Sequence, residues 1–384
     1  MNRTQALLVS TGTWHMDKTA KAFAERGALA ELWMANKNPV GVPADKFHRC
    51  WPFHLLMKPF YELTPKYYWE KAFYGFLPAW SQWVRTRPLP PCNVVHAIMG
   101  FGTEIFDRAE KTGALKVMEC PNSHPTSYFG FWQRECDIWF PGENVVIPRW
   151  MFARMNRELE RADLIVVESK FGKESMIYNG IPEQKVVVNP LGLDTTVFTK
   201  RTTIPDKPRF ICVGSITLRK GHQYLFRAFQ IVKKALPDAE LICAGGYKYD
   251  FRMERPKWEG TFTHVRLPHA KLAELLRDCT AFVFPSLEEG IAESQIQALA
   301  SGLPVIGTHS GGTTTLVDDG VEGFIVNGRD PQQIADAMIR LATDRELNQR
   351  MGEAAYRKGS PRNTWQDYGD RMLAAYEPRL ANRV

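Results

Sequence analysis

The strongest constraint on the fold is a repeated alternation of short apolar strands with amphipathic helices. In the second half of the chain, strand-like segments at 209–215 and 280–286 alternate with segments of helical period at 221–236 and 331–343. The first half opens in the same way, with an apolar strand at 5–11. Parallel strands joined by helices are buried on both faces, so this order predicts a doubly wound α/β protein.

The alternation breaks once, at 189–209, where Pro, Gly, Thr and charged residues replace periodic apolar sequence. We therefore expect two tandem Rossmann-like domains, an acceptor-binding domain over 1–195 and a donor-binding domain over 196–360. An amphipathic helix at 361–384 is expected to cross back onto the first domain. Such sheets bind ligands at the carboxyl ends of their strands, which predicts an interdomain cleft.

Composition and net charge limit the classes of protein and of binding partner that we expect. A net charge of +7 suits an anionic ligand or membrane face, and without a helix-turn-helix, zinc-finger or aromatic RNP pattern no nucleic acid partner is expected. No apolar run approaches a membrane span, and the N-terminus does not resemble a secretory signal. The seven cysteines are scattered, which predicts reduced, mostly buried thiols in a cytoplasmic protein.

Residues 47–91 interrupt the alternation with many Trp, Tyr and Phe residues spaced by Lys, Arg and Pro. Aromatic rings beside cations suit a membrane interface, which would give peripheral contact with the inner membrane face, or an apolar ligand. The same rings would also pack one or two irregular helices onto the first domain. Both interpretations stay open at this point.

A first candidate site follows the strand that ends at Val213. Gly214 turns the chain, and a helix begins after Gly221 with Arg219 and Lys220 beside its start. Backbone N–H groups at a helix start, together with these cations, can hold a diphosphate. The alternative is an ordinary strand-to-helix loop with solvated basic residues.

A second candidate site lies where the strand ending at Phe284 leads into the next helix. Glu288 and Glu289 stand there before Gly290. A carboxylate only accepts hydrogen bonds, so it suits a sugar hydroxyl, and a glycine lets a ligand approach the backbone. The acids would also favour the helix dipole, and one of the two is expected to do only that.

In this order and separation, the two loops resemble the donor half of the retaining GT-B glycosyltransferases of family 4, the glycosyl transferases group 1. The family's first motif is matched by Val213, Gly214, Ser215, Lys220 and Gly221. Its second motif is matched by Pro285, Ser286, Glu289, Gly290, Ala298, Leu299, Ala300, Gly302, Pro304 and Val305. Its third is matched by Gly311, Gly312, Leu316, Val317, Asp319, Gly320 and Gly323. The likeness covers nearly all of 160–384, and the first 160 residues match loosely.

The resemblance implies that Lys220 holds the donor diphosphate and that Glu289 holds hydroxyls of the donor sugar, both as catalytic residues. The backbone of Gly290, Ile291 and Ala292 would lie near the sugar and phosphate.

Two charged positions of the family pattern carry uncharged residues here, and two further positions near the donor sugar also differ. The family's second Glu, which binds the nucleotide ribose, is Gln297 here, and we expect the contact to be kept with less charge. The family's Arg is Ser215 here, which leaves Lys220, helped by Arg219, as the phosphate cation. Ile291 and Ala292 replace a Phe and a Gly.

In the first domain, the resemblance points to Gly12, after the first strand, near the donor phosphates. It also points to His124, which follows another strand and resembles the family's His beside the reacting carbon. His15 is a competing candidate for that role. A lone His is more often structural than functional, and both interpretations of His124 remain open.

The implied reaction is retaining transfer of a hexose from a UDP- or GDP-sugar to a glycan, lipid-linked or small-molecule acceptor, forming an α-glycosidic bond. No Asp-x-Asp motif occurs, so we expect neither a metal nor any cofactor beyond the nucleotide sugar. One alternative is a GT-B epimerase or phosphorylase, although no pyridoxal lysine context is found. Another is a catalytically weak sugar-nucleotide-binding or partner subunit, which Ser215 and Gln297 would suit.

Overall fold

The computed structural model describes residues 4–35, 39–63, 66–141, 147–194, 196–247, 258, 260–359, 363–381 and 383, with side chains described outside 59–72. The predicted domain limits at 195 and at 360–361 fall outside these residues, as does part of the 47–91 segment.

The first of two units is built on a seven-stranded parallel sheet in the order β3-β2-β1-β4-β5-β6-β7. Its strands are β1 (Ala6–Ser10), β2 (Leu29–Met34), β3 (Phe47–Arg49), β4 (Val94–Ile98), β5 (Leu115–Cys120), β6 (Leu164–Val167) and β7 (Val186–Val188). Its helices are α1 (Met16–Glu25), α2 (Trp51–Leu63), α3 (Lys66–Thr86), α4 (Thr103–Thr112), α5 (Pro125–Trp139), α6 (Arg149–Arg161) and α7 (Lys170–Tyr178), with 3₁₀ turns η1 (Ala44–Lys46) and η2 (Glu183–Lys185).

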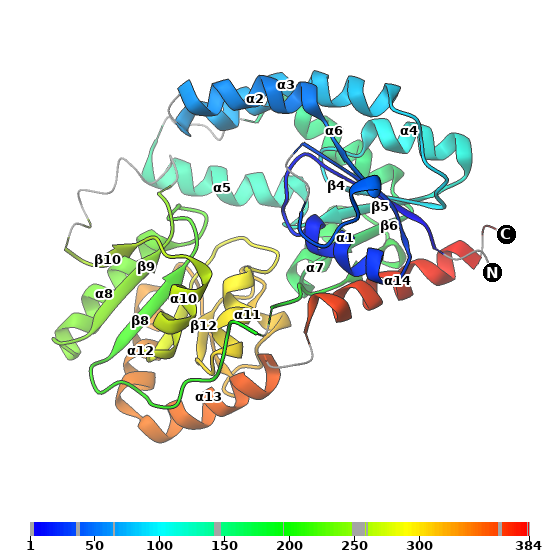
Figure 1. Ribbon diagram of the computed structural model, residues 1–384. Helices are drawn as coiled ribbons and strands as arrows, with labels where there is room; N and C mark the ends of the chain where they lie inside the picture. The colour runs from blue at the N-terminus through cyan, green and yellow to red at the C-terminus, as the bar shows by residue number, and fades with distance from the viewer. Residues whose placement is uncertain are drawn as a thin grey trace.

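The second unit is built on a six-stranded parallel sheet in the order β10-β9-β8-β11-β12-β13 (Figure 1). Its strands are β8 (Arg209–Val213), β9 (Glu240–Ala244), β10 (Thr263–Val265), β11 (Ala281–Phe284), β12 (Val305–Gly307) and β13 (Gly323–Ile325). Its helices are α8 (His222–Ala235), α10 (His269–Arg277), α11 (Glu293–Ala300), α12 (Pro331–Thr343) and α13 (Arg345–Gly359), with the 3₁₀ turn η4 (Thr313–Thr315), and α14 (Trp365–Ala381) ends the chain.

The central strands are apolar because helices cover the sheets. Every residue of β1, β4, β6 and β11 is buried. This burial is the pattern of parallel strands covered on both faces, and it explains why they read in sequence as continuous apolar runs. The seven cysteines are free thiols, and all but Cys92 are buried.

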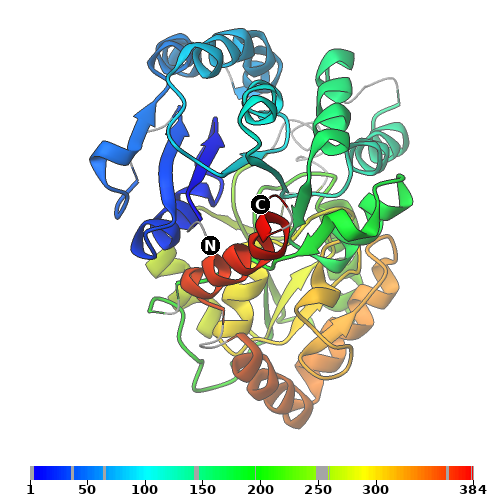
Figure 2. The ribbon, with the colours of Figure 1, turned by 90° about the vertical axis from the view of Figure 1, so that its right-hand side faces the viewer.

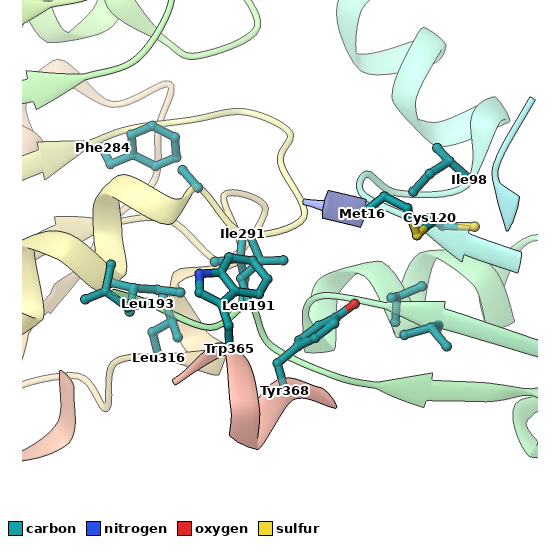
Figure 3. Packing of buried hydrophobic residues seen from close by; sticks show 14 of the residues in the cluster. Met16, Ile98, Cys120, Leu191, Leu193, Phe284, Ile291, Leu316, Trp365 and Tyr368 are labelled. Atoms are coloured by element: carbon teal, nitrogen blue, oxygen red, sulfur yellow. The ribbon is translucent and has the colours of Figure 1, made fainter. Parts of the chain in front are cut away.

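The chain crosses between the two units twice, and the two crossings run side by side. The backbone N–H of Leu193 donates to the carbonyl of Asn363 at 2.7 Å. After this point α14 runs back to the first unit and packs against α1 (Figure 2). Trp365 and Tyr368 of α14 belong to the same cluster of buried apolar residues as Ile291 of the second unit (Figure 3). The predicted pair of Rossmann-like folds with a returning C-terminal helix is therefore confirmed.

The aromatic segment forms β3, α2 and α3. Phe53 and Trp80 are buried and their rings meet edge to face, so packing of helices onto the first unit is confirmed for one side of the segment. The other side is exposed at Trp51 and Leu55. The sequence did not predict β10 or β13, since three-residue strands carry almost no periodic signal. It also did not predict the helix α13.

Candidate active site

The two predicted donor loops meet at the point where the order of the second sheet reverses. Strands β8 and β11 are neighbours although 67 residues lie between Val213 and Ala281, and the loop after each carries candidate side chains. In doubly wound sheets the crevice outside the strand ends opens at this switch point. The fold therefore brings Lys220, which follows β8, to Glu289, which follows β11.

Lys220 and Glu289 form an ion pair with 2.9 Å between Nζ and Oε2. The guanidinium of Arg219 lies 3.2 Å from the same Glu289 oxygen. Burial favours the neutral acid, but Arg219 and Lys220 outweigh it and lower the pKa of Glu289. The carboxylate is therefore ionised at neutral pH and can accept hydroxyl hydrogen bonds, and the ammonium beside it suits a phosphate.

Glu288 does not have the role that the sequence predicted for either acid, which was to bind a sugar hydroxyl or to favour the helix dipole. Its carboxylate is fully buried and accepts from the backbone N–H and the hydroxyl of Ser123, each at 2.9 Å. Arg219 completes the pairing at 3.0 Å. The expectation that one acid serves only the helix start is wrong for Glu288, because the start of α11, at its N-cap Ala292, has no side-chain cap and Glu288 instead joins the two units.

The backbone of the second loop is pressed against the first unit. A Cβ built on Gly290 would lie 2.2 Å from the carbonyl oxygen of Pro121, so only glycine fits there. The N–H of Ile291 donates to the buried carboxyl of Glu168 at 2.9 Å, and Ala292 is buried at the start of α11. The Ile291 backbone, which is predicted to bind the donor, therefore lies beside the carboxyl group of Glu168. This carboxyl group was not identified from the sequence.

The two departures from the family pattern lie close to this loop. Gln297 is nearly buried, and its amide lies 3.4 Å from the carboxylate of Glu293, one helical turn earlier. Ser215 is half-buried on the loop after β8. Ser294 donates to the carbonyl of Val213 at 3.1 Å and so fixes α11 against the end of β8.

On the first unit's side, a buried cluster faces the donor loops. His15, after β1, lies 2.6 Å from Glu119, and Glu119 lies 2.9 Å from His96. Glu168 reaches His15 at 3.7 Å, and the hydroxyl of Tyr368 donates to Glu119. Sequence reasoning named only His15 from this cluster. The available signal was that Glu119 and Glu168 end or follow buried strands, as the donor-side carboxylates do.

The charged groups of this cluster shift one another's pKa values. Burial opposes protonation of His15, but Glu119, assisted by Glu168, raises its pKa to about 9. Burial likewise works against ionised Glu119, but His15 and His96 lower its pKa. Burial raises the pKa of Glu168 to about 8. His15 is therefore a cation held between a carboxylate and a carboxyl group.

His124 and Gly12 flank this cluster. His124 caps α5, with its Nδ1 accepting from the backbone N–H of Thr126 at 3.2 Å, and burial lowers its pKa to about 4. A neutral capping imidazole is the structural reading left open in the sequence, and a functional role of His124 stays a prediction. Gly12 accepts a hydrogen bond from Ser10 at 2.7 Å on the loop after β1. Among the described residues, no group of three or more His, Cys, Asp or Glu side chains is arranged to hold a metal.

Residues 194–358 match the family described as glycosyl transferases group 1. The D-inositol 3-phosphate glycosyltransferase of Corynebacterium kroppenstedtii is 31% identical over 248 residues, which are 58% of this chain and 54% of that protein. A GDP-mannose-dependent α-(1-6)-phosphatidylinositol monomannoside mannosyltransferase of Mycolicibacterium smegmatis is 26% identical over 244 residues, 58% of this chain and 64% of that protein. The match spans about half the length of the first of these relatives.

Solved structures extend the likeness in fold to the whole chain. Sucrose-phosphate synthase from Thermosynechococcus elongatus superposes with a TM-score of 0.74 at 17% identity, covering 99% of this chain and 100% of that one. Anabaena HepE, solved with UDP and glucose, gives a TM-score of 0.69 at 14% identity, covering 98% and 100%. The fold is therefore GT-B, and the predicted resemblance to group 1 is confirmed.

Gly290→Ala tests the packing of the donor loop on the first unit. The new methyl group would overlap the Pro121 carbonyl, so we expect a loss of roughly 1–3 kcal/mol in the free energy of unfolding. Gly130→Ala, on α5 with nothing within 4 Å of its Cβ position, is the matched control and should stabilise slightly. Denaturant unfolding measures both, and equal stability of the two variants would contradict the described contact.

The His15 cluster predicts a stability that falls in alkali. A histidine whose folded pKa exceeds its unfolded value contributes stability that is complete below about pH 6.5 and is lost as the pH rises toward about 9. Glu168 acts in the same direction, because its folded pKa is also raised. We expect the free energy of unfolding to drop by roughly 2 kcal/mol between these pH values, and His15→Gln to flatten the drop.

Urea unfolding at about pH 6.5 and 9 measures this dependence. His309→Gln, which removes a histidine from an exposed pair with Glu174, is the control and should keep the wild-type slope. A His15→Gln protein with an unchanged slope would show that His15 does not carry the effect.

Proposed function

Because residues 194–358 of this chain belong to the glycosyl transferases group 1 family, we propose that the protein is a glycosyltransferase that uses a nucleotide-diphosphate sugar as donor. The observation that carries the proposal is the Lys220–Glu289 pair at the switch point of the second sheet. It supplies an ammonium for the diphosphate and a carboxylate for the sugar, side by side in a nearly buried setting. The proposed site is completed by four residues that are predicted to lie along the donor: Gly290, Ile291, Ala292 and Gln297.

The proposed chemistry depends on charge at the leaving group. As the bond from the sugar carbon to the diphosphate oxygen lengthens, negative charge builds on the diphosphate. Lys220 and the N-terminus of α11 stabilise that charge from fixed positions, and departure needs no metal in this proposal. Glu289 holds the sugar by its hydroxyl groups while the bond breaks. Retention of the anomeric configuration and an α-linked product are part of the same proposal.

The acceptor is proposed to enter from the first unit and to be a hydroxyl-bearing glycan, lipid-linked or small molecule. Support comes from the relatives, whose names refer to inositol phosphate and to a phosphatidylinositol mannoside. The donor base is proposed to be uracil or guanine, since HepE was solved with UDP and the mannosyltransferase is named for GDP-mannose.

Glu289→Gln and Lys220→Ala should each lower the rate of sugar transfer by about a hundredfold or more, because each removes a fixed charge beside the donor. The matched control is the exposed Lys271–Glu274 pair on α10, which has the same chemistry and a 2.8 Å separation. Lys271→Ala and Glu274→Gln should stay within about twofold of wild type. The measurement is release of nucleotide from a panel of UDP- and GDP-sugars with mixed acceptors.

Two results would count against the proposal. Turnover of every donor at background by the wild-type protein, with binding retained in a thermal-shift screen, would favour the sugar-nucleotide-binding alternative. Wild-type turnover by Glu289→Gln would remove the site assignment while leaving the enzyme.

We further propose peripheral attachment to an anionic membrane through the outer side of α2. Trp51, Leu55 and Leu56 of its first two turns are 56%, 62% and 47% exposed. The guanidinium of Arg49 lies 4.3 Å from the Trp51 ring, which places a cation beside these apolar groups. Such a surface suits the boundary between lipid headgroups and chains. No helix in the described part of the chain has the length and apolar character to cross a membrane.

Replacing Trp51 and Leu55 together by Ser should lower co-sedimentation with vesicles containing anionic lipid several-fold, because the exposed apolar area is removed. Val321→Ser, at another exposed apolar residue on the second unit, should have no effect. Failure of the wild-type protein to co-sediment even with anionic vesicles would remove the attachment.

A further inference from the structure

Trp14 has a strained backbone. Its φ is +43°, and among the described residues it is the only one other than glycine with a positive φ. A bulky aromatic residue in this region is a rare outlier, since its Cβ crowds the backbone. Such conformations persist where surrounding structure fixes them, and they cluster at functional sites.

The strain at Trp14 is not offset by burial of its side chain. The side chain is 55% exposed, so most of the indole surface gains nothing from folding. A Cβ built on Gly12 would lie 3.0 Å from the indole Nε1, so part of the ring lies back over the glycine and the rest faces solvent. A glycine or asparagine at position 14 would fit the same turn with less strain. The fold therefore does not need a tryptophan there.

Contacts of the residues before and after Trp14 hold the loop that follows β1 in place. Before Trp14, the hydroxyl of Ser10 donates to the Gly12 carbonyl at 2.7 Å. After it, the buried His15 is fixed by Glu119 at 2.6 Å, and the N–H of Met16 donates to the Thr13 carbonyl at 2.8 Å. The indole is thus presented on a rigid support, as a binding residue requires.

The loop lies at the carboxyl end of β1, where the order of the first sheet reverses between β1 and β4. One turn further on, Lys18 reaches Glu293 of the second unit at 3.3 Å and lies 4.5 Å from the Trp365 ring. Trp14 therefore stands on the first unit's edge of the boundary between the units, while the donor-side groups Lys220 and Glu289 belong to the second unit.

We propose that Trp14 is the stacking platform of the acceptor subsite, and that it binds one face of a six-membered polyhydroxylated ring, either a pyranose or a cyclitol. This inference rests on the proposed function. The negative face of an indole attracts the C–H groups that such a ring presents on one side, while the ring's hydroxyls stay at its edge for polar partners. The exposed Thr13 and the half-buried Gly12 flank Trp14 with polar backbone and hydroxyl groups, which suit a polyol better than a lipid chain.

The direct test is saturation-transfer NMR on the full chain, with methyl α-D-mannopyranoside, methyl α-D-glucopyranoside and myo-inositol as separate probes. We expect transfer to the ring C–H protons of at least one probe with wild-type protein, and loss of that transfer with Trp14→Ala. The two pyranosides and the cyclitol distinguish the two sources of the ring. Glycerol, an acyclic polyol, should show no transfer. Tyr178→Ala, which removes an 88% exposed aromatic ring at the far end of α7, is the matched control and should bind as wild type does.

A kinetic arm uses the donor and acceptor that turn over best. Trp14→Ala should raise the KM for the acceptor at least tenfold and the KM for the donor much less, and Trp14→Phe should recover most of the acceptor affinity. Trp14→Gly should lose the acceptor as Ala does, yet raise the melting temperature by about 2 °C, because the backbone strain is relieved.

Equal ring-proton transfer to wild type and Trp14→Ala, or transfer from no ring probe, would overturn the inference. So would a donor KM that rises as much as the acceptor KM, or a Trp14→Gly protein that melts below wild type. Any of these results can occur while Glu289→Gln still abolishes turnover, in which case the proposed function survives. The NMR arm does not depend on turnover, so it decides on Trp14 even if no donor is used.

Discussion

One buried carboxylate, that of Glu288, ties the loop after β11 to the first unit. Glu288 has no exposed surface, and its partners come from both sides of the boundary: Ser123 from the first unit and Arg219 from the second. A buried carboxylate left without partners costs several kcal/mol, so the units must meet with Ser123 opposite Glu288. That requirement sets where the neighbouring Glu289 and Gly290 lie relative to the first sheet.

The two sheets contribute different kinds of side chain to the boundary between the units. The second sheet brings Arg219 and Lys220 after β8, which suits an anion. The first sheet brings His15 after β1, together with Glu119 and Glu168 at the ends of β5 and β6. Glu168 links the two sets, because it approaches His15 and also accepts from the N–H of Ile291. Glu168 therefore connects the first cluster to the loop after β11.

Much of the fold could be predicted because it is encoded locally. Apolar runs such as β4 and β11 are buried on both faces, and the amphipathic helices between them leave only a parallel, doubly wound arrangement. The pairing of Lys220 with Glu289 was also predictable, since each follows a strand and the two strands adjoin at the switch point. Short edge strands such as β10 could not be predicted, because three residues show no period.

Partners that are remote in sequence were beyond prediction. Ser123 lies 165 residues from Glu288, and no local pattern couples them. The same holds for His15 and Tyr368, which meet only because α14 crosses back to the first unit. The strained backbone of Trp14 has no signature in the sequence, since tryptophan does not favour a positive φ.

The two departures from the group 1 pattern each remove one charged side chain, and the two lost charges have opposite signs. The family's Arg at position 215 is replaced by Ser and its Glu at position 297 by Gln, so one group of each sign is removed. The remaining side chains of the donor loops, Arg219 and Lys220 against Glu288 and Glu289, balance one another, and their ion pairs measure 2.9 to 3.2 Å. In a nearly buried site, losing only the Arg would leave an excess carboxylate, which would oppose the diphosphate of the proposed donor. Losing both keeps the numbers of basic and acidic side chains equal, and under the proposed function Lys220 exchanges its contact with Glu289 for one with the donor phosphate.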